Sequence, residues 1–141
     1  MKTIAIILSF CLGSLSLSND SVEQITLRVK ITNVANEDSN IMIAVFESHN
    51  TFLTDEMYRR EVIAVDNFTE TEIKFKIEKG EYAVAVFQDK NKNGDLDRNM
   101  FYFPSEPYGF SQNYRPVMKP PHWTDVAFQV NEPTTIEVRL D

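Results

Sequence analysis

The chain has 141 residues, a length that suits one domain, because about 150 residues is an ordinary size for a single compact core. Its formal net charge is −7, with 21 acidic residues against 14 basic ones. Such a surface repels phosphate backbones, and no basic stripe or arginine-rich arm interrupts it. Nucleic acid and an anionic membrane surface are therefore excluded as expected partners.

The N-terminal segment has the order of a secretory signal peptide. Lys2 gives a basic start, an apolar run extends over residues 3–17, and Ser16–Ser18 places small residues before a polar boundary. The apolar run is too short for a membrane span, which needs about 20 residues. We therefore predict cleavage after Ser18, export to the periplasm or secretion, and no transmembrane segment in the mature chain of residues 19–141.

Cys11 is the only cysteine and lies inside this segment, so the mature chain is expected to have no disulfide. Acylation of Cys11 would make a lipoprotein, but Phe10 is bulky where a small residue is normally needed. A second alternative is that residues 3–17 form a buried element of the fold. Loss of residues 1–18 removes Lys2 and no acid, which leaves 13 basic against 21 acidic residues and a net charge of −8.

Alternation of apolar and polar residues predicts β-strands along the mature chain. Residues 25–31 alternate strictly, which is typical of a half-buried strand. The continuous apolar run of residues 41–46 predicts a central strand that is apolar on both faces. A further strand is expected at residues 60–65. A helical turn is expected only at residues 52–58, with Thr54 as its cap.

Two β-hairpins are predicted in the second half of the chain. Residues 73–77 alternate and lead through a turn at Gly80 into the apolar run of residues 82–87, and residues 126–130 and 136–140 alternate on either side of an Asn-Glu-Pro turn. About seven short strands without a long helix predict an all-β fold. We expect a single antiparallel β-sandwich of immunoglobulin-like or transthyretin-like topology with a long aromatic loop, although the sequence does not fix the strand order.

The segment that follows the apolar strand ending at Phe87 matches the start of a calcium-binding loop, D-x-[DN]-x-[DN]-G. Oxygen-bearing side chains at alternate positions of a tight loop converge on one point, and Gly94 permits the bend that turns the next carbonyl inward. Hard oxygen ligands in this number suit calcium, which we predict as a structural cofactor. The predicted ligands within the loop are Asp89, Asn91, Asn93, Asp95 and Asp97.

The loop lacks the glutamate that completes a helix-loop-helix calcium site, because that position is Met100. A distant residue or water must then complete the shell, and Asp125, Asn99 and Glu106 are the candidates. The alternative is a solvated Asn-Gly turn whose side chains hydrogen-bond their own backbone.

Four segments, in this order along the chain, resemble a known bacterial family. They are KGEYAVAVFQD at residues 79–89, NKNGDLD at 91–97, PYGFS at 107–111 and WTDVAF at 123–128. Together they are similar to the exported family catalogued as domain of unknown function 2141, and the resemblance spans nearly the whole mature chain. It implies a small β-sandwich in the periplasm or outside the cell. It implies no activity, because the family is named for the absence of a known one.

The resemblance also bears on individual residues. It places the family's later acidic position on Asp125, which makes Asp125 the preferred distal metal ligand. Gln88 stands where histidine is common in the family, and this departure argues against histidine chemistry at that position. The family's loop positions correspond to Asp89, Asn91, Asn93, Gly94 and Asp97.

Residues 100–123 contain seven aromatic residues and five prolines, a composition too apolar for disorder. An ordered loop of this length must bury apolar surface, so the plainer interpretation is that it covers an open edge of the sandwich. The alternative is a rigid docking surface for a sugar or peptide. The residues expected to form that ligand-binding surface are Tyr102, Tyr108, Tyr114 and Trp123.

No arrangement of residues predicts a catalytic centre. His49 and His122 have no ligand spacing to each other, and no nucleophile motif or phosphate-binding glycine loop is present. We predict a non-enzymatic exported module that binds a carbohydrate, a peptide or an envelope protein. One alternative is a hydrolase of cell-envelope or extracellular polymers that uses Asp97, Glu106 and Asp125. Another is a structural envelope subunit that assembles through a sheet edge.

Overall fold

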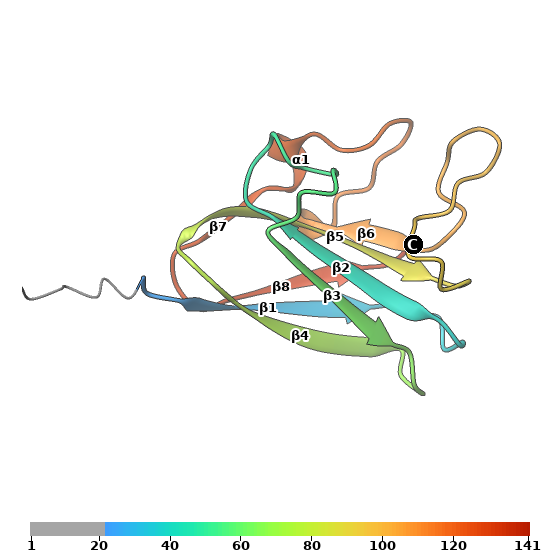
Figure 1. The fold of residues 1–141 in the computed structure, drawn as a ribbon, viewed down its shortest axis with the longest axis horizontal. Coiled ribbons are helices and arrows are strands. Elements are labelled where there is room, and N and C mark those ends of the chain that lie inside the picture. The colour runs from blue at the N-terminus through green and yellow to red at the C-terminus, as the bar shows by residue number, and fades with distance from the viewer. Residues whose placement is uncertain (1–21) are drawn as a thin grey trace, which may run out of the picture.

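The structure is a computed structural model that describes residues 22–141, so the predicted signal peptide and Cys11 lie outside the described residues. Two sheets face each other in two layers (Figure 1). One sheet has the order β4 (Glu70–Ile77), β1 (Ile25–Thr32) and β8 (Thr134–Arg139). The other has the order β3 (Arg59–Ala64), β2 (Asn40–Phe46), β5 (Gly80–Asp89) and β6 (Tyr108–Phe110), with β7 (Phe128–Val130) paired to the start of β5. The predicted all-β sandwich is confirmed.

The core lies between the two sheets and follows from the alternation in β1. Its four apolar residues are at most 5% exposed, and they pack with inward-facing residues of β2 and β5. β1 pairs antiparallel with β4 and parallel with β8, and the parallel pair joins the beginning of the described fold to its end. The inward-facing residues of β1 are Ile25, Leu27, Val29 and Ile31.

Neither predicted hairpin forms. β4 pairs with β1 whereas β5 pairs with β2, so the turn at Gly80 carries the chain from one sheet to the other. In the same way β7 pairs with β5 whereas β8 pairs with β1. Alternation specifies which face of a strand is buried but not which strand lies beside it. Two strands joined by a short turn can therefore belong to different sheets of the sandwich and still bury their apolar faces in the same core.

The helical turns also lie elsewhere than predicted. Residues 52–58 form turns and bends without a helix, and the described helical turns are η1 (Ser111–Asn113) and α1 (Trp123–Val126). In α1 the Asp125 carboxylate caps the first turn by accepting a hydrogen bond from the backbone nitrogen of His122 at 2.8 Å. Within residues 22–141, no helix combines the length and the apolar character needed to cross a membrane.

The five-stranded sheet is apolar on its outer face as well as on its inner face. In the middle of β2 and β5 the outward residues are all apolar, and the loops at residues 47–58 and within residues 90–127 fold over them, above the sheet in Figure 1. The predicted central strand at residues 41–46 is confirmed, since β2 lies between β3 and β5. These outward residues are Met42, Ala44 and Phe46 in β2 and Ala83, Ala85 and Phe87 in β5.

Candidate functional site

The calcium-like loop begins at the end of β5, where Asp89 is almost fully buried at 1% exposed. Its two carboxylate oxygens accept hydrogen bonds from the backbone nitrogens of Asn93 at 3.1 Å and Gly94 at 2.8 Å. Gly94 has a φ of +86°, the left-handed region that glycine adopts without strain. Asp89 therefore winds the loop around its own carboxylate.

The side chains of Asn91 and Asn93 converge on Asp97. Each donates its amide nitrogen to the Asp97 carboxylate, with a distance of 3.0 Å for Asn93. Their amide oxygens face the backbone instead: Asn91 Oδ1 accepts from the nitrogen of Asn93 and Asn93 Oδ1 from the nitrogen of Asp95. Four of the five predicted loop ligands thus meet through side-chain hydrogen bonds within one turn, and Asp95 joins them through its backbone.

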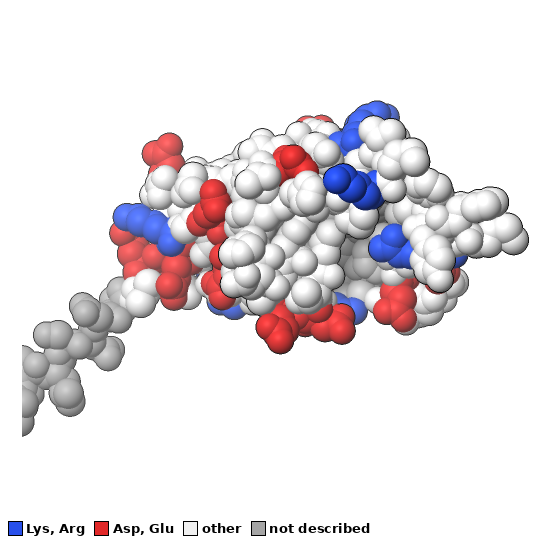
Figure 2. Space-filling view, turned by 90° about the horizontal axis from the view of Figure 1, so that it is seen from above, with Lys and Arg blue, Asp and Glu red and all other residues white. Residues whose placement is uncertain are grey.

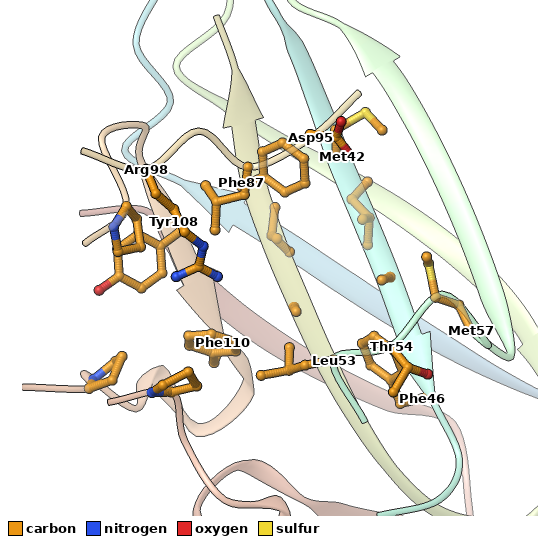
Figure 3. Close-up of a pocket in the computed structure, with 18 of the residues that line it drawn as sticks. Met42, Phe46, Leu53, Thr54, Met57, Phe87, Asp95, Arg98, Tyr108 and Phe110 are labelled. Carbon is orange, nitrogen blue, oxygen red and sulfur yellow. The ribbon is translucent and has the colours of Figure 1, made fainter. Parts of the chain in front are cut away.

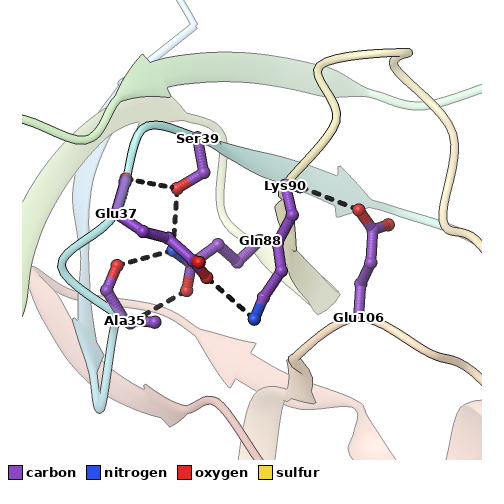
Figure 4. Close-up of polar contacts among 6 residues, drawn as sticks. All are labelled: Ala35, Glu37, Ser39, Gln88, Lys90 and Glu106. Atoms are coloured by element: carbon purple, nitrogen blue, oxygen red, sulfur yellow. Dashed lines mark hydrogen bonds and ion pairs between the residues drawn. The ribbon is translucent and has the colours of Figure 1, made fainter.

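Glu106 closes this loop from the other side. Its carboxylate is 6% exposed and accepts hydrogen bonds from the backbone nitrogens of Lys90 at 2.8 Å and Asp97 at 3.0 Å, one at each end of the loop. The Lys90 ammonium group forms an ion pair with Glu37 at 2.8 Å (Figure 4). The end of β5 is therefore tied to two neighbouring loops.

Gln88 completes this anchoring of the β5 end. Its fully buried amide accepts from the nitrogen of Ala35 at 2.9 Å and donates to the Ala35 carbonyl and the Ser39 hydroxyl, both at 2.7 Å (Figure 4). All its polar atoms have partners among the described residues. Gln88 is thus a structural residue that holds the β1–β2 loop against β5.

Asp125, the preferred distal metal ligand, lies at the other end of β5 from the loop. It lies in α1, directly before β7, and β7 pairs with the start of β5 through Phe128 and Tyr82. Asp89 is seven residues further along β5, about 23 Å at 3.3 Å per residue. Among the predicted distal candidates, Glu106 lies at the loop, and Asn99 accepts backbone hydrogen bonds from Phe101 and Phe103.

The loop has the residue types for calcium, but its side chains are arranged to bond one another. Among residues 22–141 no three His, Cys, Asp or Glu side chains gather closely enough to hold a metal ion, so a site here would depend on asparagine and backbone oxygens. A cation takes oxygen ligands, which would require the amides of Asn91 and Asn93 to turn over. Each turn would break one of the hydrogen bonds to the backbone.

A groove lies beside this loop, on the outer face of the five-stranded sheet. Its volume is about 360 Å³, within the range of small-molecule sites. Ala44 and Ala85 are direct partners across β2 and β5, and both line the groove, so two small side chains lie side by side in its floor. Larger apolar residues surround them (Figure 3): Met42, Phe46, Leu53, Met57, Phe87 and Phe110.

Three loops form the walls of the groove. They contribute residues 53–57, residues 94–104 and residues 116–120. Several apolar side chains on these loops are strongly exposed, although bulky apolar groups usually avoid water. Figure 2 looks onto this face, which is mostly uncharged, with Lys and Arg side chains gathered where the loops project. The most exposed apolar residues of the loops are Met100, Phe101, Tyr102, Val117 and Met118, all at least 72% exposed.

The structure does not bring the four predicted aromatic ligand-binding residues together. Tyr102 and Tyr108 line the groove. Tyr114 lies beside a separate small polar hollow with Arg115. Trp123 packs edge-on against Phe52, with ring centroids 5.8 Å apart, and donates its indole N–H to Glu81 at 3.0 Å. The predicted docking surface is thus divided, and Trp123 supports the end of the sheet.

The groove floor was not predicted, although the sequence carries a signal for it. β2 and β5 are apolar at both odd and even positions, so each has a second apolar face that some other element must cover.

The three acids considered for hydrolysis form no common centre, because Asp125 is at the far end of β5 from Asp97 and Glu106.

Comparison with known proteins identifies a bacterial family. A family model described as an uncharacterized protein conserved in bacteria, DUF2141, matches residues 29–137. No curated protein and no solved structure matches the chain.

Proposed function

We propose that this chain, which belongs to the DUF2141 family of uncharacterized proteins conserved in bacteria, is an exported, non-enzymatic binding module that takes an apolar ligand in its groove. The observation that supports this function is the groove itself, an apolar hollow of about 360 Å³ on a sheet face whose floor is made of small side chains. Apolar concave sites with a few polar groups at their rim are the usual form of ligand-binding sites.

The exposed apolar residues of the walls add support. Val117 and Met118 are 85% and 79% exposed beside the groove, and exposed apolar surface next to a groove is typical of ligand-binding sites. A bound apolar molecule would remove part of this surface from water, which stabilises a complex by about 25 cal/mol per Å² of buried apolar area.

The alternative of assembly through a sheet edge has weaker support. The edge strand β3 carries Arg59, Arg60 and Glu61, and β4 carries alternating charged residues on its outer face. Charges on edge strands are a common protection against pairing with another chain.

A neutral fluorescent probe tests the groove. We expect residues 19–141, which contain every described strand, to bind N-phenyl-1-naphthylamine at one saturable site. Ala85→Phe places a ring in the floor and should weaken probe binding by about tenfold or more. Thr135→Phe adds the same ring on the exposed outer face of the three-stranded sheet and should leave binding unchanged. Equal binding by both variants, with unfolding midpoints showing that both are folded, would contradict the proposal.

Calcium at the loop is a second part of the proposal, with a structural role. It is supported by the carboxylates of Asp89 and Asp97 and the amides of Asn91 and Asn93, which lie within one turn. For an extracellular-type site with a Kd of about 10⁻⁴ to 10⁻³ M, about 5 mM calcium would stabilise the fold by about 1 to 2 kcal/mol.

Thermal unfolding in EDTA and in calcium tests this part. The midpoint should rise with calcium, and Asp97→Asn should abolish the rise because it removes a charge while keeping the shape of the side chain. Asp125→Asn is the matched control and should keep the rise, since Asp125 lies away from the loop. Asp89→Ala is a poorer choice, because it also removes two hydrogen bonds that wind the loop. Identical midpoints for the unmodified protein would show that the loop is a self-bonded turn.

A further inference from the structure

Three cations that form no ion pair within residues 22–141 line the groove. The described residues contain 13 Lys and Arg side chains, all but Lys2 of the chain's 14, and seven of these form ion pairs with carboxylates. Of the six described cations that form none, three line the groove: Arg60, Arg98 and Lys119. Only two carboxylates, those of Asp55 and Asp95, line it with them. The groove is thus locally positive in a chain whose net charge is −7.

The three cations come from three different segments. Arg60 lies on β3 directly opposite Ala44, so its side chain leaves the sheet on the groove face. Arg98 extends from the loop after the calcium-like turn, and its guanidinium group lies beside Tyr108 in Figure 3. It donates one hydrogen bond, to the Tyr102 carbonyl at 3.1 Å, which leaves further donors for a ligand.

Lys119 reaches the groove from the loop before α1. The remaining unpaired cations of the described residues lie elsewhere. Arg59 lies over the ring of Tyr58, 4.0 Å from its centroid, and Lys74 and Lys76 are on the exposed face of β4. Arg60, Arg98 and Lys119 form no ion pair with a carboxylate of residues 22–141, and all three line one apolar groove, which indicates an anionic partner.

We propose that the groove binds a soluble single-chain amphiphile with an anionic head, such as a long-chain carboxylate. Its apolar chain lies over Ala44 and Ala85, and its head is bound by Arg60, Arg98 and Lys119. A neutral apolar ligand would leave the cations without a role, whereas a polyanion would meet the acidic surface elsewhere. The net negative charge does not oppose a single bound anion strongly, because exposed charges beyond about 8 Å are screened at physiological salt.

This inference rests on the proposed function, and the experiment separates the two. Residues 19–141 carrying the neutral probe are titrated with dodecanoate, dodecanol and dodecyltrimethylammonium, all below their micelle-forming concentrations. Dodecanoate should displace the probe at a concentration about tenfold lower than dodecanol, since a charge-assisted hydrogen bond contributes more than a neutral one. The cationic amphiphile should be the weakest of the three.

Single substitutions test whether Arg98 and Arg60 cause the preference for an anionic head over a neutral one. Arg98→Gln and Arg60→Gln should each weaken dodecanoate binding by about tenfold and leave dodecanol unchanged. Lys74→Gln removes an unpaired cation on the other sheet and should change neither. If dodecanoate and dodecanol displace the probe equally and the arginine variants change neither, the claim that the ligand has an anionic head is wrong. The proposal that the groove binds an apolar ligand would still stand. Probe binding that is unchanged in Ala85→Phe would overturn the groove function itself.

Sedimentation with lipid vesicles distinguishes binding of a free amphiphile from binding to a membrane surface. The protein is sedimented with vesicles of phosphatidylglycerol and, separately, of phosphatidylcholine. We expect no sedimentation with either, while dodecanoate still displaces the probe. Sedimentation with phosphatidylglycerol vesicles, combined with no displacement by dodecanoate, would overturn the free amphiphile in favour of a lipid surface.

Discussion

Removing the Glu106 carboxylate should loosen the loop that follows β5. This side chain is 6% exposed and accepts two backbone hydrogen bonds, from Lys90 at 2.8 Å and Asp97 at 3.0 Å. Glu106→Ala leaves both N–H groups without their partner, and each loss costs about 1 to 3 kcal/mol. Allowing for local relaxation, we expect the free energy of unfolding to fall by about 3 kcal/mol.

The corresponding fall in the unfolding midpoint is about 12 °C, from an unfolding entropy of about 0.25 kcal/mol/K for a domain of this size. Differential scanning calorimetry of residues 19–141 measures it. Glu106→Gln keeps one acceptor oxygen and should lose about half as much, whereas Glu132→Ala, on an exposed turn, should change stability by less than about 0.5 kcal/mol. A loss below about 1 kcal/mol in Glu106→Ala would refute the role of Glu106 in closing the loop.

Three further changes test the fold. Gln88→Leu removes the acceptor and donors that hold Ala35 and Ser39, and urea unfolding should show a loss of about 3 kcal/mol, whereas Gln129→Leu on the surface should show almost none. Gly109→Ala would place a Cβ 2.4 Å from the Arg139 carbonyl oxygen and should destabilise by about 2 kcal/mol, unlike Gly80→Ala, whose nearest atom is a side-chain carbon at 3.3 Å. Burial, with a smaller contribution from neighbouring Tyr58, raises the pKa of Tyr82 to about 12. The folded state therefore holds the Tyr82 proton more tightly than the unfolded state does. The free energy of unfolding keeps this contribution below about pH 10 and loses it as the pH rises toward 12. At pH 11, urea unfolding should show that the unmodified protein has lost about 1 kcal/mol more than Tyr82→Phe.

The sequence predicted the faces of strands better than their neighbours. Residues 25–31 and 41–46 were assigned correctly because alternation and continuous apolar runs report directly on burial. The turn at Gly80 was taken for a hairpin because a short turn between two strand-like segments is compatible with either one sheet or two. The choice between them depends on β1, which is distant in sequence and takes β4 as its partner.

The candidate site was predicted in part for the same reason. A local motif identified the self-bonded loop of Asp89 and Asn93, whose contacts lie within a few residues. The groove floor depends on the register that places Ala44 opposite Ala85, 41 positions later in the chain, and no local pattern specifies that register. Composition grouped Trp123 with Tyr102, but the structure separates them because Trp123 packs on Phe52 at the far end of the sheet.

Chemical-shift mapping tests the central claim most directly, that the outer face of the five-stranded sheet binds an anionic amphiphile. Residues 19–141 labelled with ¹⁵N would be titrated with dodecanoate below its micelle-forming concentration. The largest and saturable shifts are predicted at the backbone amides of Ala44, Ala85 and Arg98, with little change at Thr135 on the opposite sheet. Shifts centred on the three-stranded sheet, or none at millimolar dodecanoate, would contradict the claim.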